Sequence, residues 1–143
     1  MDLLKKVRGG QNTHDGIKIV KTITGEPDTL TFMFEGTKQA LGAAIFEIPV
    51  NMYPIREGDR FTAFRMFGTG PASRWAFINK INGCTVNLAT MQGPTTAKID
   101  GVDKVYGPGE LIVTTGLLAG NRVLIAPIYD SGAVKYAVIS KIS

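Results

Sequence analysis

Side chains that could carry out catalysis are scarce in this chain of 143 residues. His14 and Cys84 are its only histidine and its only cysteine, so they are the only candidates for thiol–imidazole chemistry and cannot build a zinc site by themselves. We interpret His14 as a residue of a polar connector and Cys84 as a small buried side chain. The serines lie at expected turns or at the C-terminal end, without the glycine pattern of a nucleophile elbow. The sequence therefore predicts no catalytic residue, no metal site and no cofactor.

Acidic and glycine-rich motifs lead to the same expectation. Glu35 and Asp100 each precede a glycine, which is typical of turns and only weakly suggests a carboxylate pair. Two glycine-rich stretches, 68–71 and 107–109, lack the lysine and the following helix of a phosphate-binding loop. We interpret both stretches as bends or hairpin turns.

Basic and aromatic side chains occur together in the first half of the chain. All seven phenylalanines and the only tryptophan lie there. Exposed rings beside basic side chains would form a platform for single-stranded nucleic acid. The candidate contacts are Arg56, Arg60, Arg65, Arg74 and Trp75. Their counterparts in the second half are mostly typical of a core, so packing in a core or an interface is the favoured interpretation.

Composition is that of a compact soluble protein. The net charge is +4, but the 16 basic residues are scattered among 12 acidic ones and form no run. No apolar stretch is long enough to span a bilayer, and the N-terminal sequence lacks the apolar region of a secretory signal. We expect synthesis in the cytosol and no contact with a membrane.

The two halves of the chain repeat one another. Gly42 and Gly107 lie 65 positions apart, as do the motifs that contain Glu35 and Asp100. The spacing falls to 62 for Arg60 and Arg122, and then to 61 from residue 72 onward. Similarity by chance between β-rich segments is the alternative, but collinear blocks with glycines in register favour a duplicated domain.

The elements that carry these residues are expected to be almost entirely β-strands. Residues 1–16 form a short helical segment, with Leu3, Leu4 and Val7 on one face, and a linker. Strands are expected over 17–24, 29–34, 45–50, 61–67 and 75–81, and again over 85–89, 95–99, 110–115, 122–129 and 134–142. We predict an all-β protein of two tandem small β-barrels, OB-like or SH3-like, over 17–82 and 83–143. A single larger β-sandwich is the alternative.

The last hairpin of each half is apolar on both faces, which indicates burial on both sides. A lone barrel does not require this, so another barrel or another subunit should cover the outside. The expected interface residues are Leu3, Leu4, Val7, Phe61, Phe64, Phe67, Trp75, Tyr129 and Tyr136.

Several stretches resemble small β-barrel proteins from the tail and baseplate modules of tailed phages and of phage-tail-like bacteriocins. The motif is a glycine, a polar and a basic residue, an apolar strand, a glycine turn and a final strand of basic, aromatic and apolar residues. Leu118–Ile125 and Gly132–Ile142 carry it, and Met1–Lys6, Thr95–Gly101 and Leu111–Val113 are similar to other parts of those proteins. A second barrel-like copy between the ends departs from that pattern.

The resemblance implies a non-enzymatic structural component of a phage virion, placed in the tail, hub or baseplate after assembly in the host cytoplasm. We expect a homo-oligomer that contacts other tail or baseplate proteins, with passive contact with DNA through its basic surface. The alternative is a tandem OB-fold protein that binds single-stranded nucleic acid. A carbohydrate-binding module with exposed Trp75 and Tyr136 is a third hypothesis, and an enzyme is the least favoured class.

Overall fold

The computed structural model describes residues 16–67, 73–82 and 87–143, without the side chain of Phe67. The expected N-terminal helix with Leu3, Leu4 and Val7, the residues His14 and Cys84, and the expected turn at 68–71 lie outside these described residues. The strand expected over 85–89 begins outside them as well.

The chain divides into two compact units. Unit 1 contains the described residues of 16–25, 29–48 and 57–82, and unit 2 contains Glu26–Asp28, Pro49–Arg56 and 87–143. Two short segments from the first half of the sequence thus belong to unit 2. The sequence analysis assigned both of them to the first barrel, because their spacing along the chain does not reveal which core they join.

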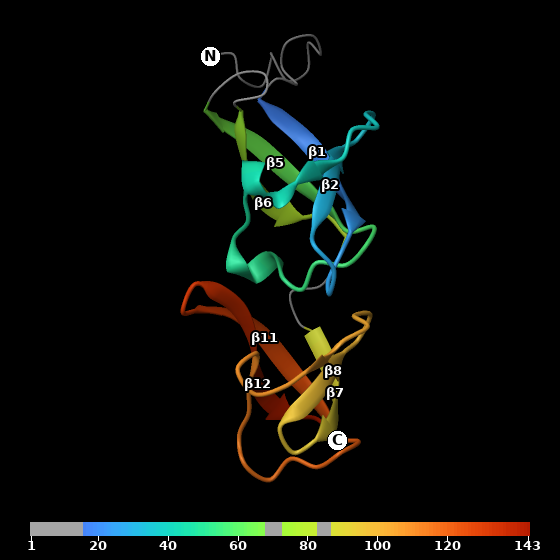
Figure 1. Ribbon diagram of the computed structural model, residues 1–143, viewed down its shortest axis with the longest axis vertical. Coiled ribbons are helices and arrows are strands. Elements are labelled where there is room, and N and C mark those ends of the chain that lie inside the picture. Colours follow the sequence, from blue (N-terminus) through green and yellow to red (C-terminus); the bar gives the residue numbers. More distant parts are fainter. Residues whose placement is uncertain (1–15, 68–72, 83–86) are drawn as a thin grey trace. The chain divides into compact units, whose positions relative to one another are not determined.

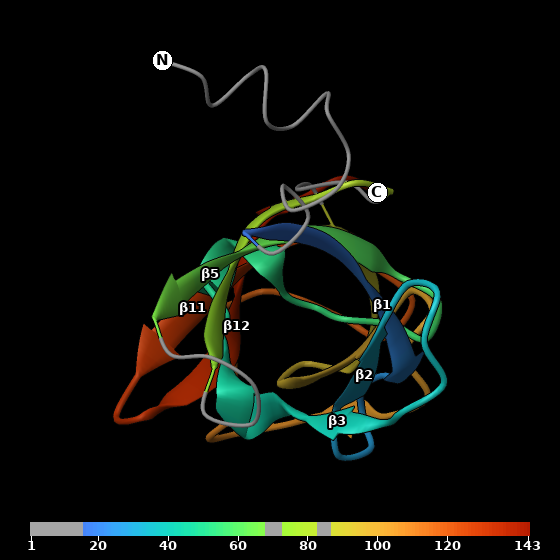
Figure 2. The ribbon, with the colours of Figure 1, turned by 90° about the horizontal axis from the view of Figure 1, so that it is seen from above.

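Unit 1 is a six-stranded sheet in the order β3-β2-β1-β5-β6-β4, and Figure 2 shows β1, β2, β3 and β5 curving around one interior. Its strands are β1 (Ile17–Thr24), β2 (Thr31–Phe34), β3 (Leu41–Gly42), β4 (Phe46–Glu47), β5 (Arg60–Phe67) and β6 (Arg74–Lys80) (Figure 1).

The two edge strands of this sheet belong to one short segment, which closes the barrel. β3 pairs antiparallel with β2 through Phe32 and Leu41, whereas β4 pairs parallel with β6 through Phe46 and Trp75. A 3-10 turn over Ala43–Ile45 joins β3 to β4. The six strands in this order form a small β-barrel, and its closure leaves few strand edges open to unwanted pairing.

Unit 2 repeats the arrangement with β9-β8-β7-β11-β12-β10 in the corresponding places. Its strands are β7 (Asn87–Gly93), β8 (Thr96–Ile99), β9 (Val105–Tyr106), β10 (Leu111–Ile112), β11 (Arg122–Asp130) and β12 (Ala133–Lys141). The hairpin between β11 and β12 turns through Ser131 and Gly132, whose φ angles of 54° and 81° are those of a two-residue turn that follows the strand twist. The expected all-β fold of two tandem small barrels is confirmed.

Strand register repeats between the units as well. The counterparts, given as unit 1 with unit 2, include Val20 with Ala89, Phe32 with Ala97, Phe61 with Val123 and Trp75 with Tyr136. The parallel closing pair of unit 2, Leu111 with Tyr136, is the counterpart of Phe46 with Trp75. The structure thus reproduces the spacings of 65, 62 and 61 that the sequence contains, and adds a spacing of 69 between β1 and β7.

The two cores reach a similar packing with different side chains. Unit 1 is filled by rings: Phe61 stacks on Phe77 with their centroids 4.5 Å apart, and Phe32 meets Phe77 edge-on at 5.3 Å. The counterparts of these three rings in unit 2 are the smaller Ala97, Val123 and Val138, all buried. Unit 2 instead has Met91, Tyr106 and Ile125 where unit 1 has Thr22, Leu41 and Ala63. Large and small residues are exchanged between facing positions, which preserves the filled volume that a close-packed core requires.

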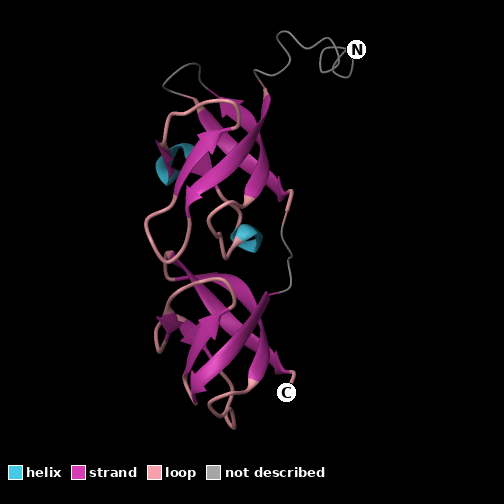
Figure 3. Ribbon diagram, turned by 90° about the vertical axis from the view of Figure 1, so that its right-hand side faces the viewer, coloured by secondary structure: helices cyan, strands magenta, loops and turns pink. Residues whose placement is uncertain are grey.

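Some expected strands are shorter than predicted. Only Phe46–Glu47 of 45–50, and Leu111–Ile112 of 110–115, are paired. Residues 50–52 form a 3-10 turn instead, one of the two short helical turns among the described residues (Figure 3). The two-residue strands β3 and β9 were not predicted, since so short a segment leaves no alternating pattern.

We predict that Phe32→Ala destabilises unit 1 by about 3–5 kcal/mol, because the ring is fully buried among three others. Denaturant unfolding followed by Trp75 fluorescence measures this loss. Phe64→Ala is the control, since its ring is 43% exposed and its loss should cost about 1 kcal/mol or less. Equal losses for the two variants would contradict the assignment of the core.

Candidate functional site

The outer face of the β1-β5-β6 sheet in unit 1 is apolar. Ile17 lies directly opposite Phe64, and Phe64 lies opposite Ala76 on the next strand. Phe64 is 43% exposed and Ile78 51% exposed. The apolar residues on this face, which we term the outer face of unit 1, are Ile17, Ile19, Phe64, Met66, Ala76 and Ile78. A contiguous apolar area of this kind marks an interaction site more often than a free surface.

Unit 2 has an apolar face at the corresponding positions. The outer face of unit 2 consists of Leu88, Leu124, Ala126, Ile128, Ala137 and Ile139. Ala126 lies opposite Ala137, as Phe64 lies opposite Ala76. Ile139 is 61% exposed and is the counterpart of Ile78. Both barrels therefore keep an apolar outer face in addition to an apolar interior, as the two-sided pattern of the sequence indicated.

One ion pair occurs in both units at equivalent positions. Nε and Nη2 of Arg60 donate to the two carboxylate oxygens of Glu35, at 2.9 and 3.0 Å. Arg122 also donates two hydrogen bonds to the carboxylate of Asp100, here from Nη1 and Nη2, at 2.7 Å each. The hydrogen bonds from Arg122 hold the pKa of Asp100 below its usual value, against the opposing effect of partial burial. Glu35 and Asp100, which begin the turns after β2 and β8, thus tie the ends of these strands to the arginines that begin β5 and β11.

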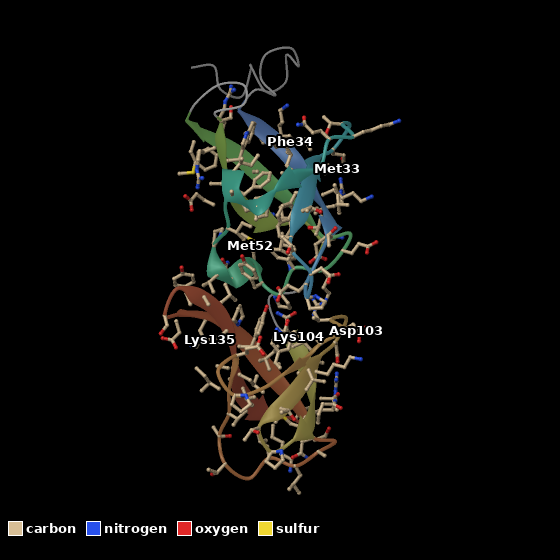
Figure 4. All side chains as sticks on the ribbon, in the orientation of Figure 1. Met33, Phe34, Met52, Asp103, Lys104 and Lys135 are labelled. Atoms are coloured by element: carbon tan, nitrogen blue, oxygen red, sulfur yellow. The ribbon has the colours of Figure 1, made fainter. Side chains whose placement is uncertain are left out.

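A carboxylate lies between two tyrosine hydroxyls in unit 2. Tyr136 donates to both oxygens of Glu26 at 2.9 Å, and Tyr106 donates to one of them at 3.1 Å. The backbone N–H of Ile55 donates to Glu26 as well, at 2.9 Å. Tyr106 lies on β9 and Tyr136 on β12, so the end of the barrel at which these rings meet is named here the mouth of unit 2. The labelled Met52, Lys104 and Lys135 lie at this same end (Figure 4).

Arg56 fixes the second of the two segments at this mouth. Its Nε donates to the carbonyl of Asp100 at 2.9 Å, and Nη2 donates to Oδ1 of the buried Asn87 at 3.3 Å. Arg56 also passes so close to Gly101 that a Cβ there would lie 2.6 Å from Nε. Gly101 has a φ of 83°, so both the backbone and the arginine require glycine. We refer to Glu26–Asp28 and Pro49–Arg56 together as the cap of unit 2.

The tyrosines at the mouth are held in their protonated form. Burial raises the pKa of Tyr136, Tyr106 and Tyr53 above the usual value, and the negative charge of Glu26 raises each of them further. Because a neutral hydroxyl can donate to the carboxylate and a tyrosinate cannot, this arrangement is structural rather than nucleophilic. The polar groups of the mouth of unit 2 thus pair with one another, except the buried amide nitrogen of Asn87, which has no hydrogen-bond partner among the described residues.

The cap corresponds to the positions at which the two halves differ in length. Six residues separate β1 from β2, but only two separate β7 from β8. Twelve residues separate β4 from β5, and nine separate β10 from β11. Most of the additional residues of the first half therefore fall in the two connections that supply the cap, and the rest fall in the connection between β5 and β6. The sequence analysis interpreted Glu26 only as part of a turn and did not single out Tyr53 or Tyr106; these length differences were the available signal.

The expected aromatic interface residues lie in different environments. Phe61, Trp75 and Tyr136 are buried in the cores of their barrels, where a partner cannot reach them. Phe64 belongs to the outer face of unit 1, and Tyr129, at the end of β11, is 67% exposed. The interior position of Trp75 and Tyr136 also removes the exposed rings that a carbohydrate-binding module would need.

Three of the four candidate nucleic-acid arginines bind other parts of this chain. Arg56 belongs to the cap, Arg60 pairs with Glu35, and Arg74 forms an ion pair with Glu47 at 2.6 Å. Arg65 lies over the ring of Trp75, with Cζ 5.8 Å from its centroid. The structure does not bring these arginines together around an exposed ring.

Other classes of site are not found in the part of the chain that the structure describes. No group of three or more histidine, cysteine or acidic side chains there is arranged to hold a metal ion. No helix among these residues is long and apolar enough to cross a membrane. No known protein family matches the sequence, and no curated protein matches it either.

We predict that Asp100→Asn flattens the acid side of the stability profile. The pKa of Asp100 is lowered in the folded state, so its contribution is complete above the ordinary value of about 3.9 and is lost as the pH falls through the lower, folded value. Unfolding free energies measured across this range should fall less steeply in the variant. Asp103→Asn is the control, because the Asp103 side chain is 97% exposed; an equal change in both variants would contradict the prediction.

We predict that the free energy of unfolding falls as the pH rises on the alkaline side. Since the pKa of Tyr106 and Tyr136 is raised by folding, the unfolded chain releases protons above about pH 10 that the folded chain retains, and the free energy of unfolding decreases. Glu26→Gln removes the charge that contributes to both shifts, so tyrosinate absorbance should appear at a lower pH. Glu35→Gln, a carboxylate of unit 1, should leave the tyrosine titration unchanged; an identical titration in the Glu26 variant would refute the role of this carboxylate.

Proposed function

We propose that this chain is a non-enzymatic structural component of a phage virion, in the tail or baseplate, whose barrels assemble through their outer faces. The observation that carries the proposal is the apolar outer face at equivalent positions of both units. The outer face is apolar in both units, although the interior side chains change from rings in unit 1 to mainly aliphatic residues in unit 2. We infer that the apolar outer face has a role apart from folding of the barrel. Burial against a partner accounts for it.

Assignment to a phage tail rests on the resemblance of the chain termini and of the last hairpin to small tail and baseplate barrels. Two features of the fold are in keeping with it. The described residues contain a filled, structurally paired mouth in unit 2 rather than an open polar cleft, and their buried tyrosines are held protonated. Both features suit a protein that binds other proteins through its surface and catalyses no reaction.

Light scattering after size fractionation tests the role of the outer faces. We expect the wild-type chain to form a defined oligomer, and the double variant Phe64→Lys with Ile78→Lys to have the mass of a monomer. Val105→Lys is the matched control, because Val105 is 51% exposed on β9, outside both outer faces. A wild-type monomer, or equal behaviour of the control, would contradict assembly through these faces.

The place in the virion has a separate test. Antibodies against the chain should label tails or baseplates of purified particles in electron micrographs, and the chain should be present in them in fixed stoichiometry. Particles that lack the chain would refute the virion assignment, even if the protein forms oligomers.

A second candidate function is the binding of single-stranded nucleic acid. The small-barrel fold and the two cations beside Trp75, Lys18 and Arg65, favour it. It predicts binding of an oligonucleotide that weakens steeply with salt and is lost in Arg65→Gln. The burial of Trp75, which is only 4% exposed, speaks for the structural role.

A further inference from the structure

Unit 1 contains a cavity at the positions that correspond to the mouth of unit 2. Its volume is about 370 Å³. It is lined by Phe34, Thr37, Gln39, Leu41, Ile45, Ser73 and Trp75. Leu41 is the counterpart of Tyr106, and Trp75 is the counterpart of Tyr136. We name this cavity and its rim the mouth of unit 1; Phe34, labelled in Figure 4, lies at the end of β2 on its wall.

The two mouths differ in what covers them. In unit 2 the counterparts of Phe34 and Thr37, Ile99 and Val102, are 0% and 2% exposed. Phe34 is half-buried and Thr37 is exposed. The difference arises because unit 2 possesses a cap, which inserts the Glu26 carboxylate between Tyr106 and Tyr136. Among the described residues, the same barrel position is thus occupied in unit 2 and open in unit 1.

Two cations approach the aromatic wall of the mouth of unit 1, although neither lines the cavity itself. The Lys18 ammonium lies 5.1 Å from the ring centroid of Phe34 and 5.9 Å from that of Trp75, and Arg65 approaches Trp75 from another strand. Lys18 and Arg65 form no ion pair with another described residue. The counterparts of these two residues in unit 2 are Asn87 and Pro127, both uncharged. Where unit 2 offers tyrosine hydroxyls to a carboxylate, unit 1 offers an ammonium and a guanidinium.

We propose that the mouth of unit 1 is a docking site for a surface loop of another protein that carries a carboxylate. The apolar wall receives the loop as the wall of unit 2 receives its cap, and Lys18 and Arg65 pair with the carboxylate. Charge-assisted hydrogen bonds of this kind are shorter and stronger than neutral ones. The site is separate from the outer faces and does not depend on the function proposed above.

The length of the connections argues that the occupant is a different protein rather than a second copy. The chain supplies one cap, and its residues already belong to unit 2. The corresponding connections of the second half are four and three residues shorter, and the first of them, Pro94-Thr95, carries no carboxylate. Among the described residues, a second copy therefore has no spare loop equivalent to the cap.

Trp75 is the only tryptophan of the chain and lines the cavity, so its fluorescence reports occupancy directly. The probe is a synthetic peptide with the sequence of residues 25–30, Gly-Glu-Pro-Asp-Thr-Leu, blocked at both ends and added to the full-length protein. We expect a saturable change in Trp75 emission that weakens as salt rises. The peptide with Gln and Asn in place of Glu and Asp should bind about tenfold more weakly, which corresponds to the loss of a charged contact.

Variants of the mouth complete the test. Lys18→Gln with Arg65→Gln should weaken the acidic peptide about tenfold or more, whereas Lys21→Gln, an exposed lysine on the same strand, should bind it as the wild type does. Cooperative unfolding of each variant shows that it is folded. If the double variant does not unfold cooperatively, the single variant Lys18→Gln is used in its place.

Four results would overturn the proposal. The first is the absence of a saturable change in Trp75 emission at millimolar peptide. The second is that the neutral peptide binds as tightly as the acidic one, or that the double variant binds the acidic peptide as tightly as the wild type does. In the third, the peptide dissociates a dimer of the chain, which would make a second copy the occupant. In the fourth, an oligonucleotide alters Trp75 emission and the peptide does not, which would assign the mouth to nucleic acid.

Discussion

Closure of a very small sheet is the constraint on which the rest of this structure depends. Each barrel closes through only two residues of parallel pairing, Phe46–Glu47 with β6 in unit 1 and Leu111–Ile112 with β12 in unit 2. Pairing so short cannot hold the edges together by backbone hydrogen bonds alone, and packing of the interior must contribute. Phe46 and Trp75, or Leu111 and Tyr136, are both paired and buried, so closure and core formation stabilise each other.

The same constraint explains how two copies of one barrel came to differ. Once the closing pairs and the arginine ion pairs are kept, the interior tolerates exchange of rings for aliphatic side chains, provided that small residues face large ones. The ends of the barrel are less constrained, because loops there change length without disturbing the strands. The ends are where the copies diverge: one mouth is filled by a carboxylate and two tyrosines, and the other, among the described residues, is an open cavity whose Trp75 wall lies beside Lys18 and Arg65.

The fold was largely predictable from the sequence, and the sites were not. Repeated glycines and strand-like segments predict two barrels because duplication and two-residue periodicity are local properties of the chain. The two-sided apolar pattern of Phe61–Phe67 also predicts an apolar outer face. By contrast, the pairing of Glu26 with Tyr136 joins residues 110 positions apart, and nothing in the neighbourhood of Glu26 distinguishes it from a turn residue. The rings of Trp75 and Tyr136 were interpreted as surface candidates because aromatic residues in a strand of alternating pattern fit either face.

The composition of unit 2 from three separate segments has a consequence for how the chain can be divided. Starting from residue 16, the backbone passes between the two units five times, at 25/26, 28/29, 48/49, 56/57 and 83/84. No single cut, in a gene or by a protease, releases unit 2 whole: a fragment that begins at residue 87 has the tyrosines without their carboxylate. Recombination that exchanges second halves between related genes would separate Tyr106 and Tyr136 from Glu26, so each half depends on the other although the two repeat one another.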